Sequence, residues 1–597
     1  MADRWRWLGW FGVVNGLVLA VIALRYLGGV EPGGSVAAWV YLVTIMLSQH
    51  ALLALLPLAL VLAPLILLRA PERALRLAGV VVMAVLIALL MLDSLLWADS
   101  RFHLNAFTAR ILGWQSWVFA GVMLLIGLVF EGLLAKRVWA WVSAKRRRGG
   151  RWVAAALAGC FVVAQGIHAW ADATYFVPVT SVGQQLPVHS GISAKGLLTK
   201  LGWVDVSQSR ERALARRMAD ENRGPGGGLA YPLAPLECRN PEPRNLLIIM
   251  VDAMRADVVR EDVMPRVHAF SGMALDFRSH WSGGNSSRIG AFSFFYGLPP
   301  AYWDTFEAVQ RPAVLVDELQ RQDYALGIFS SGVLNRPVVL DRTAFAEVRG
   351  LRVATEPRDA PGWQRDEIIT EDWLAWLEDR PPDRPFFGFL FYDAPTAGSH
   401  PPELETRFEA PAGHPMPREW EAYLASLAHV DRLIGRVLDE LRERGLWENT
   451  VVMLTSDHGE EFDDSGEGLD EHGSGFSRHQ LQVPMLLHWP GREARVVQRR
   501  TSHYDVAPTL VTHLLGCTNP PSDYASGNDL LGDSAWDWLV AGSYYNYAIV
   551  EPDQVTVVFP TGGFEVRGPD YRRVDDPEFR GDTLEAVMHE NRRFIKP

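Results

Sequence analysis

The sequence has only three cysteines in 597 residues, Cys160, Cys238 and Cys517. So few cysteines exclude a disulfide-rich scaffold, and their spacing does not fit a zinc site. Cys238 and Cys517 could pair if their part of the chain lay in an oxidising compartment, but the sequence alone does not favour that pairing. The chain also lacks internal repeats, and its 49% hydrophobic content excludes a disordered or collagen-like protein.

The chain also has no excess of positive charge: its net charge is −12. The charge is unevenly distributed: residues 1–177 carry a net +8, whereas residues 178–597 carry −20. A globally acidic chain of this kind is not expected to bind nucleic acid.

Five long apolar stretches dominate the first 177 residues. Each is long enough for the ~20 helical residues that cross a ~30 Å hydrocarbon layer. A cleaved signal peptide does not explain the first stretch, because it has no small-residue cleavage site and four more stretches follow. Eleven of the 22 tryptophans fall in this region, as in an interfacial aromatic belt. The stretches lie near 8–28, 42–68, 76–97, 115–135 and 152–176. The second is overlong and contains Pro57 and Pro64, so we expect a kink there and part of 35–45 at the interface.

The cations between the spans predict the orientation of the membrane domain. They cluster before the first span, between the second and third, and between the fourth and fifth. These segments are therefore expected in the cytoplasm. An odd number of spans then places the C-terminal part on the opposite side of the membrane, which in a bacterium is the periplasm. The cations are Arg4, Arg6, Arg69, Arg73, Arg76, Lys136, Arg137, Lys145, Arg146, Arg147, Arg148 and Arg151.

Some charged groups in and next to the spans allow two interpretations. Asp93 and Glu131 lie within or near the ends of spans, where a position at the headgroup level is favoured over a functional one. The run 145–148 fits anionic lipid or a partner, but topology alone explains it equally well. A polar connector, 178–244, contains an amphipathic stretch at 194–221. Its cations either meet lipid phosphates or form a solvated helix face; they include Arg210, Arg212, Arg216 and Arg217.

From residue 245 the pattern changes to short apolar runs that alternate with amphipathic helices. Such alternation predicts an α/β domain with a mostly parallel central sheet over 245–597. The clearest helix spans 420–444, where leucines and valines recur at helical spacing and Gly445 ends the pattern. We expect strands at 246–251, 325–329, 386–392, 451–455, 483–488, 547–550 and 555–558.

Acidic residues directly follow two of these strands, Asp252 after the first and Asp457-His458 after the strand at 451–455. Ligands bind beyond the carboxyl ends of parallel strands, and two carboxylates with an imidazole suit one divalent metal ion, Mg²⁺, Mn²⁺ or Zn²⁺. A third element, 282–290, places Ser286 at the start of a helix. There it is either a nucleophile activated by a metal or an ordinary helix cap.

These motifs resemble those of the alkaline phosphatase superfamily, specifically its sulfatase-like and lipid-head-group-transferring membrane enzymes. The resemblance rests on Asp252, the Gly-Asn-Ser-Ser turn at 284–287, the helix that ends before Thr450, and Thr-Ser-Asp-His-Gly-Glu at 455–460. It implies an N-terminal five-helix transmembrane domain followed by a sulfatase-like α/β domain. It also implies a single-metal site of Asp252, Ser286, Asp457 and His458.

The resemblance assigns further roles. Ser286 would be the nucleophile, with Ser287 the alternative, and His472 would face the substrate phosphate or a second metal. Relatives place a histidine after the Ala-Pro that ends the middle strand, where this chain has Thr396, so His400 would substitute. A sulfatase proper is disfavoured, because no Cys/Ser-x-Pro/Ala-x-Arg sequence lies near Ser286. Two more residues match a family stretch and are expected to hold a helix start rather than a metal; they are His503 and Asp505.

Over nearly its whole length the chain resembles a family of Gram-negative inner-membrane regulators with five spans before such a domain. That resemblance implies a protein that binds lipopolysaccharide at the periplasmic face and restrains a LapB-type membrane adaptor. The adaptor, with the protease FtsH, controls degradation of the deacetylase LpxC. The alternative is a metal-dependent phospho- or sulfo-ester hydrolase, or a lipid head-group transferase, that uses Ser286.

Overall fold

In the computed structural model the chain divides into two compact units, residues 1–230 with 595–597 and residues 231–594. The first unit takes in the predicted membrane domain and most of the predicted connector. The described residues are 1–27, 35–100, 103–104, 114–145, 149–183, 186–187, 191–192, 194–205, 209, 229–335, 337–544, 546–559, 564–575, 577 and 580–595.

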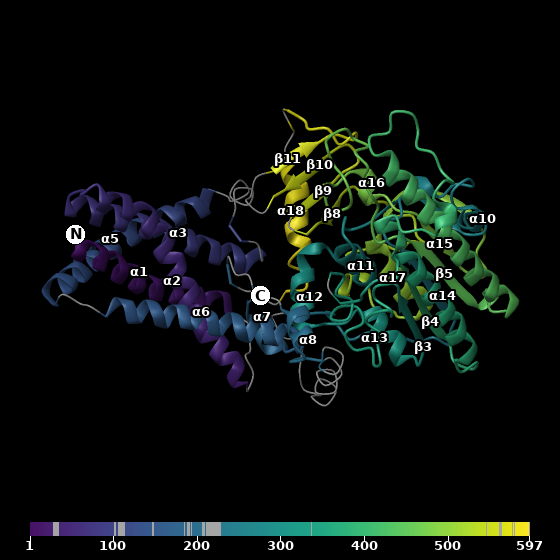
Figure 1. The fold of residues 1–597 in the computed structure, drawn as a ribbon, viewed down its shortest axis with the longest axis horizontal. Helices are drawn as coiled ribbons and strands as arrows, with labels where there is room; N and C mark the ends of the chain where they lie inside the picture. The colour runs from purple at the N-terminus through teal and green to yellow at the C-terminus, as the bar shows by residue number, and fades with distance from the viewer. Residues whose placement is uncertain are drawn as a thin grey trace. The chain divides into compact units, whose positions relative to one another are not determined.

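Five helices in the first unit are long and apolar enough to cross a membrane, which confirms the five predicted spans. Two short helices follow, α7 (Val177–Gly183) and α8 (Lys195–Lys200). Helix α2 is continuous and contains both prolines of the second predicted span, Pro57 and Pro64. The five long helices are α1 (Ala2–Ala23), α2 (Val36–Leu67), α3 (Glu72–Ser100), α5 (Trp114–Lys145) and α6 (Gly150–Ala173) (Figure 1).

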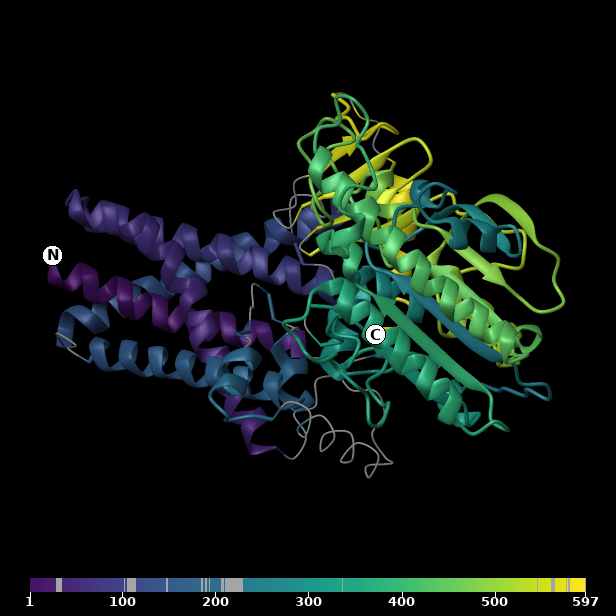
Figure 2. The same ribbon diagram turned by 45° about the vertical axis from the view of Figure 1, so that its right-hand side comes forward.

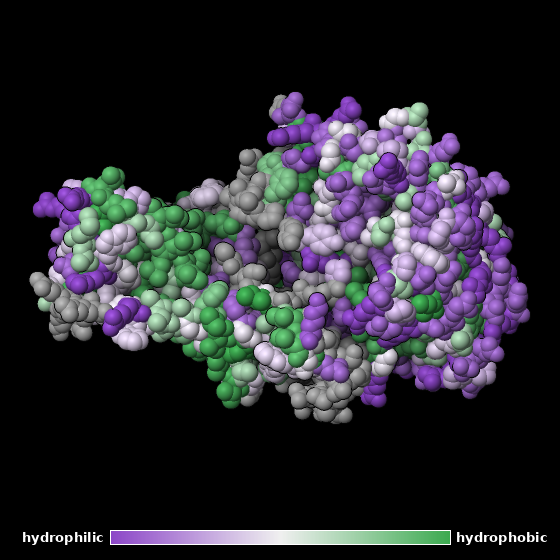
Figure 3. All heavy atoms as spheres, viewed as in Figure 1, coloured by the Kyte–Doolittle hydropathy of each residue, from purple (hydrophilic) through white to green (hydrophobic). Residues whose placement is uncertain are grey.

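Small residues let the long helices of this unit pack closely. A Cβ added at Gly16 of α1 would lie 2.8 Å from the Cα of Ala51 in α2, so the two backbones are almost in contact. Glycine and alanine at helix crossings are typical of membrane bundles, where dispersion contacts replace the hydrophobic effect. Large apolar side chains such as Val21 and Leu60 face outward, and Figure 3 shows the resulting apolar surface. This outer surface is suited to lipid.

The two acidic residues that the sequence analysis singles out, Asp93 and Glu131, are buried against neighbouring helices. Glu131 of α5 accepts a hydrogen bond from the Asn15 side chain of α1, at 3.1 Å. Asp93 of α3 accepts from the Tyr26 hydroxyl at 2.5 Å and contacts His103 Nδ1 at 2.9 Å. Protein groups therefore contact both carboxylates, although Glu131 Oε1 has no hydrogen-bond partner among the described residues.

The second unit is built on a seven-stranded sheet in the order β3-β4-β1-β5-β6-β2-β7. Strand β1 lies near the centre and pairs in parallel with β4 and β5, and β4 pairs in parallel with β3. Strand β6 is antiparallel to both of its neighbours. The predicted mostly parallel sheet is therefore confirmed. The strands are β1 (Asn245–Val251), β2 (Leu275–Trp281), β3 (Ala325–Ser330), β4 (Phe386–Tyr392), β5 (Thr450–Thr455), β6 (Met485–His488) and β7 (Arg495–Ser502).

Helices cover both faces of this sheet because its central strands are apolar on both sides. On one face α10 (Pro265–Ser271), α14 (Gly362–Asp379) and α15 (Pro417–Glu443) join a single buried core with Leu247 and Leu390. Figures 1 and 2 show α14 and α15 side by side over the strands. On the other face α11 (Ser287–Tyr296) packs Phe295 edge-on against Phe389 of β4. Two further helices are α12 (Trp303–Val309) and α13 (Val314–Arg321).

A second, four-stranded antiparallel sheet follows, in the order β11-β10-β9-β8. Two of its strands, β9 (Tyr547–Val550) and β10 (Val555–Val558), lie where the sequence predicts them. The other two, β8 (Leu539–Gly542) and β11 (Phe564–Arg567), were not predicted. Helix α18 (Gly581–Glu590) completes the unit. Two backbone hydrogen bonds tie the smaller sheet to the turn before α11: Asn285 N–H donates to the Gly542 carbonyl at 3.0 Å, and Gly542 N–H donates to the Gly283 carbonyl at 2.9 Å.

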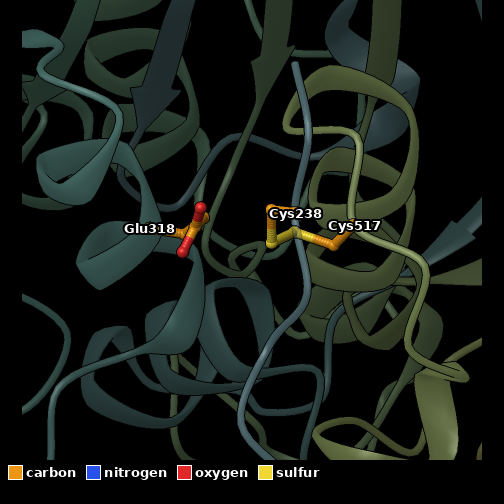
Figure 4. A group of neighbouring side chains, drawn as sticks. All are labelled: Cys238, Glu318 and Cys517. Carbon is orange, nitrogen blue, oxygen red and sulfur yellow. A yellow bond between two sulfur atoms is a disulfide. The ribbon is translucent and has the colours of Figure 1, made fainter.

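Cys238 and Cys517 form a disulfide, a pairing that the sequence did not favour. The two segments lie antiparallel, because Arg239 N–H donates to the Gly516 carbonyl and Thr518 N–H donates to the Glu237 carbonyl. A separation of 279 residues gives no local signal of this pairing. Figure 4 shows that Glu318 lies beside the two sulfurs. Since the sulfurs are bonded to each other and Glu318 binds Arg321 and Gln322, this group is structural.

Candidate metal centre

Three carboxylates follow three neighbouring parallel strands. Asp252 comes directly after β1, Asp393 after β4 and Asp457 two residues after the end of β5. The carboxyl ends of these strands meet at one edge of the sheet, which brings the acids together. The residue after Asp252, Ala253, has a φ of 61°, a conformation that non-glycine residues rarely adopt. This turn lets Ala253 N–H donate to Asp457 Oδ1 at 3.3 Å.

Asp252, Asp457 and His458 form a buried cluster whose ligand atoms lie within 4.8 Å of one another. His458 Nε2 is 3.4 Å from Asp252 Oδ1 and 3.5 Å from Asp457 Oδ2. Neither of these oxygens has a hydrogen-bond partner among the described residues. Buried carboxylate oxygens without a partner are costly. The three side chains that the sequence predicts as metal ligands therefore lie together in the structure.

The hydrogen bonds of His458 fix its tautomer. Its Nδ1 lies 2.8 Å from the Gly459 carbonyl oxygen, which can only accept, so Nδ1 carries the proton. The neutral ring therefore presents the Nε2 lone pair to the two carboxylates. Three acceptors facing one another without a proton between them are the arrangement that a divalent cation needs. We conclude that the residues present fit a single divalent metal ion.

The electrostatics of the cluster agree with that conclusion. Burial, and then the charge of Asp457, raises the pKa of Asp252 well above its ordinary value. Burial raises the pKa of Asp457 to about 6. Burial, and then the charge of His472, lowers the pKa of His458 well below its ordinary value. The protein by itself thus disfavours the charged carboxylates, and a bound cation would reverse that balance.

Ser286 and Ser287 differ in where the structure places their hydroxyls. Ser287, the first residue of α11, has its Oγ 3.3 Å from Asp252 Oδ2 and 3.2 Å from His458 Nε2. Ser286 is the N-cap residue; its Oγ is buried and has no partner among the described residues, and its side chain does not cap the helix. The geometry therefore favours Ser287 as the hydroxyl next to the metal ligands.

Two further groups border this cluster. The His472 ring stacks on the His458 ring at 4.6 Å between centroids. Its Nδ1 lies 3.5 Å from Glu460 Oε2, and its Nε2 lies 3.3 Å from the Tyr544 hydroxyl. Burial lowers the pKa of His472, but the hydrogen bond and charge of Glu460, together with the charges of Asp457 and Glu471, raise the pKa overall. The Arg288 guanidinium lies over the Trp303 and Tyr544 rings and donates to the Tyr544 carbonyl at 2.6 Å.

Other predicted residues lie elsewhere. His400 Nδ1 contacts the Pro401 carbonyl oxygen at 3.0 Å, and no hydrogen bond or ion pair in the described part joins it to the cluster. Asp505 and Ser502 cap the turn at 503–505 reciprocally, as predicted. The run 146–148 and the four connector arginines lie outside the described residues; these arginines are Arg210, Arg212, Arg216 and Arg217.

Asp393 was missed by the sequence reasoning. It is close enough to Asp252 and Asp457 that its charge raises the pKa of Asp252. Its own carboxylate pairs with Arg365 at 3.3 Å. The signal that could have found it is the one used for Asp252, an acid directly after a buried strand.

Comparison with known proteins agrees with this architecture. The sulfatase family matches residues 244–517, and a domain of unknown function matches residues 1–238. The inner membrane protein YejM of Salmonella typhimurium is 27% identical over 99% of this chain and 97% of its own length. Over almost its whole length the chain is therefore similar to YejM, and its second half contains a sulfatase-like domain. An uncharacterized protein of Haemophilus influenzae is 23% identical over 99% of this chain and 96% of its own length.

Among solved structures, the phosphonate monoester hydrolase of Agrobacterium radiobacter has a TM-score of 0.44 and 18% identity, and the match covers 58% of this chain and 93% of the hydrolase. The lipoteichoic acid synthase LtaP of Listeria monocytogenes has a TM-score of 0.43 and 13% identity, and the match covers 60% of this chain and 94% of the synthase.

Proposed function

We propose that this chain regulates lipopolysaccharide levels from the inner membrane, with its sulfatase-like domain in the periplasm. In this proposal lipopolysaccharide binds at the periplasmic face, and its occupancy changes the contacts of the spans with a LapB-type adaptor. That adaptor in turn controls LpxC degradation through FtsH. The observation that carries the proposal is the similarity to YejM along the whole chain, membrane domain included.

Two structural features support the orientation. The cations of the span-connecting segments favour a cytoplasmic N-terminus, and five spans then put the second unit outside. The Cys238–Cys517 disulfide supports the same side, since such bonds persist in oxidising compartments such as the periplasm.

The connector tests the regulatory proposal. In a deletion strain complemented with this chain, changing Arg210, Arg212, Arg216 and Arg217 to glutamine should weaken lipopolysaccharide binding and alter cellular lipopolysaccharide and LpxC levels. The matched control changes four surface arginines of the second unit, Arg260, Arg418, Arg492 and Arg572. Unchanged lipopolysaccharide binding and levels in the connector variant would refute the proposed role of the connector.

We further propose that the metal centre can cleave or transfer a phospho- or sulfo-ester. The partnerless carboxylate oxygens and the Ser287 hydroxyl beside them support this second function. A bound divalent ion would supply positive charge next to the ester oxygens. Asp252, Asp457 and His458 would hold it, with Ser287 as the favoured nucleophile and Ser286 as the alternative.

The chain's own groups suit the proton transfers of such a reaction. As Ser287 Oγ bonds to phosphorus, Asp252 Oδ2 can accept the hydroxyl proton along their existing 3.3 Å hydrogen bond. The raised pKa of His472 keeps a proton available for the leaving ester oxygen. The start of α11 directs backbone N–H groups toward an anionic substrate.

A pair of adjacent substitutions tests the catalytic proposal. With the metal-loaded full chain and a phosphodiester or monoester substrate, Ser287→Ala should reduce turnover at least 100-fold, whereas Ser286→Ala should reduce it far less. Asp457→Asn should release the bound metal, measured by elemental analysis. If both serine variants keep parental turnover, the enzymatic function fails. Normal lipopolysaccharide control by Ser287→Ala in cells would separate regulation from catalysis.

A further inference from the structure

A cavity of about 420 Å³ opens between α1, α2 and α6 in the membrane unit. It lies at the end of the bundle where α1 and α6 begin, since Arg6 and Arg151 both line it (Figure 1). Its walls include Gly9, Trp10, Val13 and Leu157. The site described above lies in the other unit, so this cavity belongs to neither proposed function.

The mouth of the cavity is cationic. Arg151 lies over the Trp152 ring at 5.3 Å, and no carboxylate in the described part of the chain pairs with it. Arg6 donates to Asp3 through Nη1 at 2.7 Å, on an exposed surface. Two guanidiniums against one carboxylate leave a net positive charge at this mouth. Guanidinium groups match phosphate oxygens in geometry as well as charge.

The interior of the cavity is apolar and open. An added Cβ at Gly9 would meet no atom within 4 Å, so this helix face points into free space. From Arg6 to Val13, and from Arg151 to Leu157, the helices rise by ~10 Å and ~9 Å respectively. Exposed Trp5 and Trp152 flank the mouth, as tryptophans do at the headgroup level. The cavity thus runs from the headgroup region into the hydrocarbon.

We propose that this cavity binds an anionic glycerophospholipid of the leaflet that faces the N-terminus. The phosphate lies between Arg6 and Arg151, and the start of one acyl chain lies along Gly9, Val13 and Leu157. Size favours a lipid over a partner helix, because ten helical residues, ~15 Å long and ~10 Å wide, would occupy roughly 1,200 Å³. The proposed lipid is distinct from the lipopolysaccharide of the regulatory proposal, which binds at the opposite face.

Lipid binding by the full chain in detergent tests this site. Native mass spectrometry would count phosphatidylglycerol molecules retained, with phosphatidylcholine as the uncharged comparison. We expect the parent to retain phosphatidylglycerol at least tenfold better than phosphatidylcholine. Added inorganic phosphate at the same concentration should not displace it, since the acyl chain contributes to binding; displacement would identify a simple anion site and overturn the proposal.

Two variants separate charge from shape. Arg6→Gln with Arg151→Gln should lose the tenfold preference, and Gly9→Leu should lose binding by filling the cavity while leaving both charges in place. The matched control, Arg4→Gln with Arg137→Gln, removes two cations that do not line the cavity and should bind like the parent. Circular dichroism checks that each variant is folded, and Arg6→Lys with Arg151→Lys should restore part of the preference.

Several results would overturn the proposal. If the control and the Arg6/Arg151 variant lost the preference for phosphatidylglycerol equally, the cations of this surface would attract lipid without a specific site. Unchanged retention in Gly9→Leu would mean that the lipid lies elsewhere. A change of oligomeric state in Gly9→Leu, with lipid retention intact, would identify the cavity as a contact between copies of this chain.

Discussion

A buried pair of histidines supports the strand-end loop that carries the metal centre. His503 Nε2 lies 2.9 Å from the Ser456 carbonyl oxygen, so it carries the proton and donates. His503 Nδ1 then accepts from His280 Nε2, also at 2.9 Å, and His280 Nδ1 accepts from the Thr501 hydroxyl. This chain of bonds requires both rings to be neutral. It positions the backbone of Ser456 immediately before Asp457.

Acidification should therefore destabilise this unit. Burial lowers the pKa of His503 to about 3, whereas the unfolded histidine titrates near 6.5. Between these values the unfolded state binds more protons, so stability is full above pH 6.5 and declines as pH falls toward 3. From pH 7 to 5 the loss is about 2 kcal/mol for this histidine. Thermal unfolding of the full chain at both pH values measures it.

His503→Gln should reduce this pH dependence, because glutamine can donate to Ser456 but does not titrate. His268→Gln removes an exposed histidine and serves as the control, which should keep the parental pH dependence. An identical shift in unfolding temperature for all three proteins would rule out this role of His503.

At the residue scale the sequence could predict the chemistry but not the choice between neighbours. The convergence of Asp252, Asp457 and His458 follows from their places after parallel strands. Which of Ser286 and Ser287 faces them depends on where α11 begins, because Ser286 has an extended backbone and Ser287 is the first helical residue. The Cys238–Cys517 bond depends on tertiary contacts 279 residues apart, which no local pattern encodes.

At the element scale, α11 can reach the metal loop only because Gly290 lacks a side chain. A Cβ at this position would lie 2.1 Å from the Asp457 carbonyl oxygen, a backbone atom that cannot rotate away. Gly290→Ala should therefore push α11 away from the loop and separate Ser287 from Asp252. We expect weaker metal binding and a loss of ~1–3 kcal/mol in the free energy of unfolding. Calorimetric metal titration and thermal unfolding measure both effects.

Gly272→Ala is the matched control, because its nearest neighbour would lie at an ordinary 3.5 Å. It should leave metal affinity unchanged. Parental metal affinity in Gly290→Ala would show that the contact between α11 and the loop is not needed for the site.

The elements that the sequence predicted share a strong apolar pattern. Strands β1, β4 and β5 are buried along their whole length, and α15 buries a regular apolar stripe. The missed strand β7 reads Arg-Val-Val-Gln-Arg-Arg-Thr-Ser, and its first half is largely exposed at the sheet edge. Strands β8 and β11 have four residues each. Pairing with neighbours, rather than local hydrophobicity, forms these strands.

For the whole molecule, the disulfide and the membrane topology depend on each other. Cys238 lies just before β1 and Cys517 lies after the last strand of the main sheet, so their bond closes a loop around that sheet. Loop closure of this length can stabilise a domain by roughly 2–5 kcal/mol. Such a bond forms only if the second unit reaches an oxidising compartment, which requires an odd number of spans after a cytoplasmic N-terminus.

Counting reactive thiols tests whether the second unit lies in an oxidising compartment. Protein from wild-type cells, denatured without reductant, should take up one alkyl group, at Cys160, and three after reduction. The Cys160→Ser variant should take up no alkyl group without reductant and two alkyl groups after reduction. In cells that lack periplasmic thiol oxidation, three groups should react without reductant, and the unfolding temperature should fall. Three reactive thiols in wild-type cells would instead mean that the second unit lies in the cytoplasm, and the periplasmic sensing proposal would fail with it.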